Sequence, residues 1–146
     1  MTIRTFCIGD YEAVYALWTR TPGMGLNDVD DSREGIERYL IRNPRTSFVA
    51  EDGGGIIGVI MCGHDGRRGY IHHTCVAACN RREGLGTRLL ETALEALRAE
   101  GISKTALVVF GRNEDGNAFW EHAGFTTRQD LNYRNRALIE LKRMDT

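Results

Sequence analysis

The stretch VAACNRREGLGTRLL, residues 76–90, passes from the end of an apolar strand pattern through a basic turn into a long helical pattern. Leucine and alanine recur at helical spacings through it and beyond it, which predicts an amphipathic helix over about residues 84–100. The apolar stripe of this helix consists of Leu85, Leu89, Leu90, Ala93, Leu94 and Leu97. A strand, a glycine-containing turn and a helix in this order are typical of an α/β domain.

The turn in this stretch is suited to bind an anion. Unpaired N–H groups at a helix start, together with the helix dipole, favour a phosphate there. Gly84 and Gly86 place no side chain between the main chain and a phosphate oxygen. Nearby positive charge comes from Arg81, Arg82 and Arg88. Leu89 stands where a dinucleotide fingerprint needs glycine, and no GxxxxGK motif is present, so the turn matches neither of the two best-known nucleotide loops.

Patterns before and after this stretch predict further strands and helices. Strands are expected at residues 2–7, 47–51, 56–63, 69–77 and 105–110. Further helices are expected from Asp10, from a capping box formed by Asp31 and Glu34, and over residues 117–123. The order of elements implies both parallel and antiparallel pairing, so we predict a mixed α/β (α+β) sheet.

The end of the chain also has a strand pattern. Leu131 and Tyr133, and then residues 137–141, suggest a closing antiparallel pair with a turn near Asn135. Strands of this kind also offer a route by which two copies of the chain could pair into a homodimer.

Composition limits the class of protein. The 146 residues have the size of one domain and contain no linker or repeat, so a single domain over residues 1–146 is expected. With 19 Lys and Arg against 20 Asp and Glu, the net charge of −1 disfavours a nucleic-acid or membrane-surface partner. No apolar run approaches the ~20 residues that span a bilayer, and no secretory signal pattern is present, so we expect a cytoplasmic protein.

The cysteines favour a reduced, metal-free chain. The four cysteines form no CxxC pair. Cys75 and Cys79 follow His72 and His73 closely, which is one arrangement that a metal site uses. Apolar thiols in strands, kept reduced in a cytoplasm, are the preferred interpretation, and no metal site is predicted.

Two motifs resemble the GNAT family of N-acetyltransferases. The string RREGLG at residues 81–86 fits the family's (Gln/Arg)-x-x-Gly-x-(Gly/Ala) signature and follows Val76 at the family's spacing. Asn113, then Trp120 and the pair GF at residues 124–125, resembles the second family motif. Together with the order of elements, the resemblance covers nearly the whole chain.

The resemblance implies a central sheet of about seven strands with four helices. It also implies transfer of an acetyl group from acetyl-CoA, a co-substrate, to a primary amine by direct attack in a ternary complex. The amine would belong to a small molecule or to a peptide or protein N-terminus, and no metal is implied. The residues implied to bind the cofactor are Cys75, Val76, Arg81, Arg82, Gly84, Leu85, Gly86, Thr87, Asn113 and Trp120.

His72 is the leading candidate for the catalytic base. An alkylammonium keeps its proton until about pH 10, so a group that accepts this proton is useful. Some family members place Glu or His at positions that match Tyr70 and His72, and an imidazole titrates near neutrality. Strand alternation places His73 on the opposite face, together with Ile71 and Cys75, unless a bulge intervenes. The alternative is that His72 only makes hydrogen bonds within the sheet.

Trp120 departs from the family pattern. Many relatives carry a tyrosine there, which protonates the leaving thiolate, whereas an indole N–H is not a usable acid. Tyr70 or Tyr133 then supplies the proton, or the thiolate leaves unaided, or catalysis is impaired. The departure keeps a non-catalytic acyl-CoA sensor or interaction module on the same fold as an alternative function. Glu51 is a reserve base.

The acceptor side carries an acidic loop. Asp28, Asp30 and Asp31 stand close together before the second expected helix. Clustered carboxylates favour a cationic amine acceptor, and the alternative is a solvated loop that caps the helix.

Overall fold

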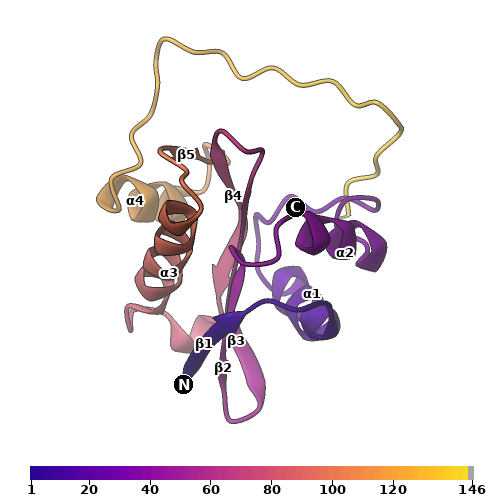
Figure 1. Cartoon of the computed structure of the whole chain (residues 1–146), viewed down its shortest axis with the longest axis vertical. Helices are drawn as coiled ribbons and strands as arrows, with labels where there is room; N and C mark the ends of the chain where they lie inside the picture. The colour runs from indigo at the N-terminus through magenta and orange to yellow at the C-terminus, as the bar shows by residue number, and fades with distance from the viewer. Residues whose placement is uncertain (145–146) are drawn as a thin grey trace.

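Five strands form one sheet in the computed structural model, which describes residues 1–144 (Figure 1). They are β1 (Thr2–Thr5), β2 (Phe48–Asp52), β3 (Gly55–His64), β4 (Gly69–Val76) and β5 (Thr105–Ala106). The strands lie in chain order, and all neighbours are antiparallel except β4 and β5, which are parallel. The mixed α/β class is therefore confirmed, with five of the roughly seven expected strands formed among the described residues.

Helices cover both faces of the sheet (Figure 1). They are α1 (Tyr11–Thr19), α2 (Arg33–Arg42), α3 (Leu85–Ala99) and α4 (Glu114–His122), with short 3-10 turns η1 (Ile8–Asp10) and η2 (Ala78–Asn80). Ser32, rather than the expected Asp31, is the N-cap of α2, because its hydroxyl oxygen accepts a hydrogen bond from the Gly35 N–H at 3.0 Å. None of the helices in the described part of the chain is long and apolar enough to cross a membrane.

Two apolar cores lie on opposite faces of the sheet. Along β3, Val59 and Met61 face α1 and α2, whereas Ile60 and Cys62 face α3. This is the alternation that a strand buried on both faces requires. The predicted leucine stripe of α3 is buried against the second face, where Leu89 has no exposed surface.

A bulge interrupts β4 between His72 and Cys75. Cys75 pairs with Val59 and His72 pairs with Met61, so two residues of β4 lie opposite one residue of β3. An extra residue in one strand reverses which face the following side chains take. The sequence pattern by itself has no feature that places this bulge.

Because of the bulge, His73 and Cys75 lie on a different face of the sheet from the one that strand alternation predicts. The ring of His73 lies edge-on to Trp18 of α1 with centroids 5.0 Å apart, and Cys75 belongs to the core beside α1. Ile71 instead packs in the core beside α3. The expectation that His73 and Cys75 share a face with Ile71 was therefore wrong, because the bulge falls between them.

The end of the chain differs from the expected closing pair. The strand predicted at residues 105–110 is paired only at Thr105 and Ala106. After α4 the chain leaves the body in a wide arc and returns beside α2 (Figure 1), where residues 142–144 bond to residues 26–28. Between these points, the predicted strands at residues 131–133 and 137–141 do not form, and the chain bends at residues 138–139.

Candidate active site

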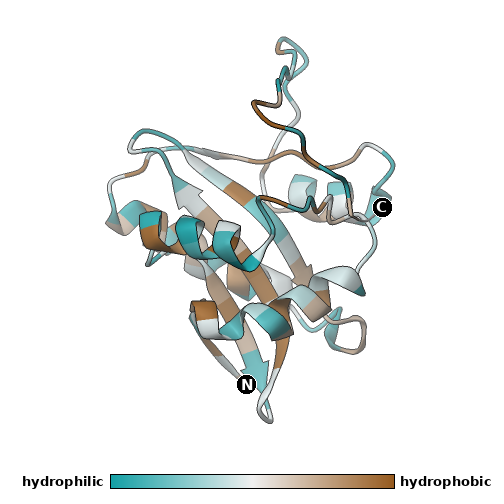
Figure 2. Cartoon of the chain, turned by 90° about the vertical axis from the view of Figure 1, so that its right-hand side faces the viewer, coloured by the Kyte–Doolittle hydropathy of each residue, from teal (hydrophilic) through white to brown (hydrophobic). Residues whose placement is uncertain are grey.

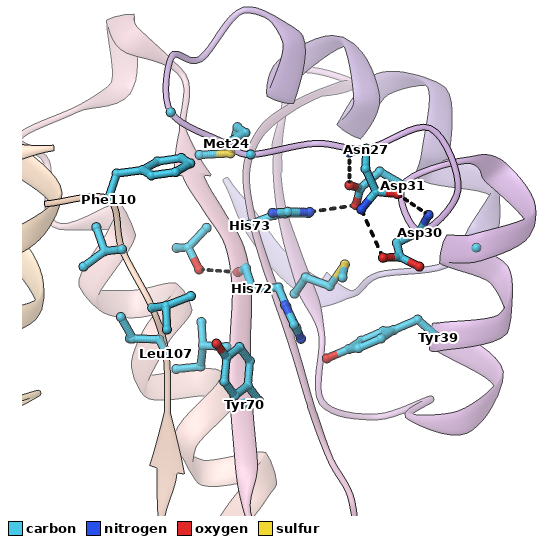
Figure 3. Close-up of a pocket in the computed structure, with 18 of the residues that line it drawn as sticks. Met24, Asn27, Asp30, Asp31, Tyr39, Tyr70, His72, His73, Leu107 and Phe110 are labelled. Atoms are coloured by element: carbon cyan, nitrogen blue, oxygen red, sulfur yellow. Dashed lines mark hydrogen bonds and ion pairs between the residues drawn. The ribbon is translucent and has the colours of Figure 1, made fainter. Parts of the chain in front are cut away.

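A pocket of about 1020 Å³ lies beside β4, and residues far apart in the sequence line it (Figure 3). Its walls come from the loop before α2, from α2, from β4, from residues 107–110 and from α4 with its N-cap. The ladder between β4 and β5 stops at Tyr70 and Ala106, and beyond it the continuations of both strands line the pocket. The two strands thus separate and leave a gap between them.

His73 and Asp31 form a buried pair on the pocket wall. His73 Nε2 lies 2.7 Å from Asp31 Oδ1, and the side chain of Asp31 is only 3% exposed. The other oxygen of Asp31 accepts a hydrogen bond from the Asn27 N–H at 2.8 Å, so the carboxylate is held at both ends. A carboxylate accepts a hydrogen bond from the ring N–H that faces it, so the neutral ring carries its proton on Nε2 and Nδ1 has a free lone pair. This geometry is that of an oriented base.

His72 lies in the same pocket but in a different environment. Figure 3 shows it between Tyr70 and Tyr39, whose ring centroids lie 4.7 and 5.7 Å from that of His72. Burial, and to a smaller extent the neighbouring His73, lowers the pKa of His72 to about 4. At neutral pH His72 is therefore an uncharged and weak base.

Three tyrosines surround the histidines. Burial raises the pKa of Tyr70, and nearby Tyr133 adds to that shift, so the Tyr70 phenol keeps its proton at neutral pH. Tyr133 lines the pocket from the C-terminal segment and is 69% exposed. The Tyr39 hydroxyl is buried with no hydrogen-bond partner among residues 1–144, and burial raises its pKa. The pocket thus holds phenol O–H groups that can donate a hydrogen bond or a proton.

The turn before α3 keeps its amide groups available. Gly84 is the N-cap of α3 and has a φ of 78°. Residues that carry a side chain rarely adopt this backbone conformation. The Arg88 N–H donates to the Gly84 carbonyl oxygen at 3.1 Å, so the amides of Leu85, Gly86 and Thr87 precede the first helical hydrogen bond. Within residues 1–144, no backbone carbonyl accepts a hydrogen bond from these three amides.

Neighbouring residues of the turn have structural roles as well. Arg81 Nε donates to the carbonyl oxygen of Val76 at 3.1 Å and closes the loop after β4. Arg82 is exposed and has a φ of 66°, which is uncommon for a residue other than glycine. A Cβ on Gly86 would lie 3.3 Å from the ring of Phe119, so this glycine also permits close packing of α3 on α4.

The remaining predicted cofactor residues lie near the gap. Cys75 is buried, and burial raises the pKa of its thiol to about 11. Asn113 lines the pocket and caps α4, because its Oδ1 accepts from the Gly116 N–H at 2.9 Å. Trp120 also lines the pocket, with its ring edge-on to Phe119 and Phe125.

Charged groups of both signs line the pocket at the loop before α2 and along α2. Of the acidic loop, Asp30 and Asp31 line the pocket, whereas Asp28 accepts a hydrogen bond from the Lys142 N–H at 2.7 Å. Arg38 and Arg42 of α2 line it too, and neither has an ion-pair partner within the described residues.

The reserve base that the sequence offered lies outside the pocket. Glu51 lies outside the pocket lining and binds Arg4 with a nitrogen-to-oxygen distance of 3.0 Å, so it is not placed to act as a base. In the part of the chain that the structure describes, no three His, Cys, Asp or Glu side chains are grouped to hold a metal ion.

Comparisons with known proteins show the family and the fold of the chain. A sequence model of the acetyltransferase (GNAT) family matches residues 11–125. Acetyltransferase SG1711 of Sodalis glossinidius is 32% identical over 140 residues, which cover 96% of this chain and 97% of that protein. Ard1 from Thermoplasma volcanium has a TM-score of 0.76 at 23% identity, over 86% of this chain and 82% of its own.

A second solved structure contains a cofactor-like molecule. It is AAC(6')-Iy in complex with the bisubstrate analogue CoA-S-monomethyl-acetylneamine, with a TM-score of 0.72 at 17% identity. The match covers 93% of this chain and 98% of that one, and it shows a shared fold. Because the family model spans most of the sequence and a relative at 32% identity covers nearly all of it, the chain belongs to the acetyltransferase (GNAT) family and is an N-acetyltransferase.

Proposed function

We propose that the chain transfers an acetyl group from acetyl-CoA to the primary amine of a small molecule or of a peptide or protein N-terminus. The transfer takes place by direct attack in a ternary complex. The observation that carries the proposal is the gap between β4 and residues 107–110, which has the amide-rich turn beyond one end of β4 and the His73–Asp31 pair on its wall. An extended thioester arm fits between two separating strands because their free backbone groups can bond to it.

The diphosphate of the co-substrate belongs at the turn in this proposal. The amides of Leu85, Gly86 and Thr87 have no backbone acceptor of their own, and a helix start attracts negative charge. A Cβ at Gly84 would meet no atom within 4 Å, so the surface above the turn is open to a ligand. Arg82 and Arg88 are exposed beside it.

His73, rather than His72, takes the proton in the proposed mechanism. The amine nitrogen attacks the thioester carbonyl carbon, the carbon–sulfur bond breaks, and His73 Nδ1 accepts the proton that the amine loses. Asp31 stabilises the imidazolium that forms, since its carboxylate already bonds the other ring nitrogen. His72 is the weaker candidate because its pKa of about 4 gives little driving force for taking a proton from an ammonium.

A phenol supplies the proton to the leaving thiolate. Tyr70 and Tyr133 lie next to each other at the pocket, and Tyr70 keeps its proton at neutral pH. Trp120 packs against two phenylalanines and offers only an indole N–H, which is too weak an acid for this step.

The pocket charges suggest which amines are accepted. Asp30 and Asp31 lie where they attract an ammonium group, and the free guanidinium groups of Arg38 and Arg42 attract a carboxylate or phosphate. We infer that preferred acceptors carry both an amine and an acidic group, within the amine class already proposed.

An assay of thiol release tests the proposal. Acetyl-CoA is incubated with a panel of amines in matched pairs, each with a free carboxylate or as its methyl ester, and free CoA thiol is measured. Turnover with at least one amine is expected, with higher kcat/KM for the carboxylated member of its pair.

A second measurement separates catalysis from binding alone. Thermal stabilisation by CoA without thiol release from any amine would instead favour the non-catalytic sensor, which the tryptophan at position 120 keeps as the rival function. The absence of any stabilisation at millimolar CoA would contradict both functions, because a ligand that binds only the folded state raises the melting temperature.

A further inference from the structure

Asp31 is held at three points, and one of them lies outside the pocket. Its Oδ1 lies 2.7 Å from Nε2 of His73, and its Oδ2 accepts a hydrogen bond from the Asn27 N–H at 2.8 Å. Its main-chain carbonyl oxygen accepts a third hydrogen bond, from the hydroxyl of Tyr11 at 2.6 Å. The residue that caps α2 is Ser32 instead. The contacts of Asp31 therefore serve to fix its carboxylate rather than to cap the helix.

The side chain of Asn27 shapes the loop that presents Asp31. Its Oδ1 accepts hydrogen bonds from the N–H groups of Val29 and Asp30, at 3.0 and 2.7 Å. Its Nδ2 donates to Oδ2 of Asp30 at 3.0 Å. Figure 3 shows the contacts that run from Asn27 to both acidic side chains. These bonds close the loop into a tight turn, which keeps the Asn27 N–H directed at the Asp31 carboxylate.

Tyr11 reaches Asp31 from a different element of the fold. It is the first residue of α1, which lies against the same face of the sheet as His73. Trp18, on the same helix, packs edge-on against the ring of His73. Burial raises the pKa of Tyr11 to about 12, so at neutral pH its hydroxyl keeps the proton that it donates to Asp31. One helix thus contacts both members of the His73–Asp31 pair. Figure 2 shows the helices packed over the apolar strands of the sheet.

The position of the Asp31 carboxylate decides which nitrogen of His73 carries the proton. A carboxylate that faces Nε2 keeps the proton of the neutral ring there and leaves the lone pair on Nδ1. His72 is the nearest other titratable ring, with centroids 6.2 Å apart, and it makes no hydrogen bond to His73. Asp30 also lines the pocket, but it is bonded to Asn27. Among residues 1–144, Asp31 alone therefore fixes the tautomer of His73.

We propose that Asn27 and Tyr11 are positioning residues for the acetyl transfer: they hold the Asp31 carboxylate on Nε2 of His73, so that Nδ1 stays free for the proton of the amine. The inference rests on the proposed role of His73 as the base. Tyr11 does not line the pocket, so its hydroxyl acts through Asp31 and not through a contact with substrate. Hydrogen bonds of this supporting kind lock the groups that react in an active site.

The variant Tyr11→Phe tests the proposal by removing one hydroxyl. It is expected to lower kcat about tenfold or more at pH 7, since a small misplacement of a reacting group costs a factor of this order. The loss should be much smaller at pH 9.5, where more of the amine is already unprotonated. The KM for acetyl-CoA should stay unchanged, because the turn before α3 is not altered.

Tyr15→Phe is the matched control for this variant. Tyr15 lies on the same helix, with its ring 5.5 Å from that of Tyr11, and its hydroxyl makes no hydrogen bond within residues 1–144. It should keep the kcat of the wild type. A Tyr11→Phe enzyme as active as Tyr15→Phe would overturn the proposal, as would a loss of kcat that is equal at both pH values.

Two substitutions at Asn27 test the turn itself. Asn27→Ala removes the oxygen that accepts the two N–H groups of the loop, whereas Asn27→Ser keeps a hydroxyl oxygen that can accept from them. The alanine variant should lose kcat at pH 7, and the serine variant should recover part of it. Equal kcat values in the two variants would overturn the role of Asn27.

A measurement without substrate separates this inference from the proposed function. Nitrogen chemical shifts of labelled histidine rings report which ring nitrogen carries the proton. In the wild type the neutral ring of His73 should carry it on Nε2, and in Tyr11→Phe both tautomers should be populated. An unchanged tautomer in Tyr11→Phe would overturn the inference even in an active enzyme. A wild type that releases thiol with no amine would contradict the proposed function, and the tautomers would still show whether Tyr11 holds Asp31 on Nε2.

Discussion

His72 should make the stability of this protein depend on pH in a way that one substitution removes. Burial lowers its pKa from the ordinary 6.5 to about 4, so between these values the unfolded chain binds a proton that the folded chain does not. Stability then rises with pH across this window and falls as the solution is acidified through it. The effect comes from the site of His72 beside Tyr39 and Tyr70 on β4.

The size of the effect follows from the two pKa values. Lowering the pH from 7 to 5 protonates nearly all of the unfolded imidazole and about a tenth of the folded one, which corresponds to about 2 kcal/mol of lost stability. His72→Asn removes the titrating group, so the variant should lose about 2 kcal/mol less than the wild type over the same interval.

Urea unfolding followed by fluorescence at pH 7 and pH 5 measures these differences. The remaining side chains are the same in both proteins, so the comparison isolates the contribution of His72. His122→Asn is the matched control, since His122 is exposed on α4 and its loss should leave the pH dependence of the wild type unchanged. Equal losses in wild type and His72→Asn would refute the reasoning and would return His72 to the position of a competent base.

Three further outcomes are expected. Gly84→Val should abolish the thermal stabilisation by CoA. Gly54→Val is the control, since Gly54 has a similar φ of 85° in the hairpin turn, and it should keep the stabilisation. Equal shifts of the melting temperature by CoA in both variants would exclude the turn before α3 as the phosphate site. Asp31→Asn should lower kcat by about 10²-fold or more at pH 7 and by much less at pH 9.5, where free amine is plentiful, and a pH-independent loss would argue against a His73 base. Leu89→Ala should lower the free energy of unfolding by about 2–5 kcal/mol in urea titrations, because Leu89 is fully buried, and a loss below about 1 kcal/mol would contradict that packing.

Local patterns in the sequence were sufficient for the main elements of the fold. The stripe of α3 and the glycine turn before it are signals within about two dozen consecutive residues, and both stand where they were predicted. The alternation of β3 side chains between the two cores also follows from local sequence, because successive residues of a strand point to opposite faces of the sheet.

The arrangement of side chains in the pocket beside β4 was decided by the tertiary structure. A one-residue bulge in β4 brought His73 to the same side as His72, and a bulge depends on how two strands register rather than on either sequence alone. Asp31 bonds to His73 although the two residues are 42 positions apart in the sequence. The acidic residues of the Asp31 loop had suggested only a helix cap or an attraction for a cationic amine. The strand pattern at the C-terminal end of the chain likewise did not decide whether these residues pair, since strand pairing joins distant segments and the residues of one segment do not identify the other.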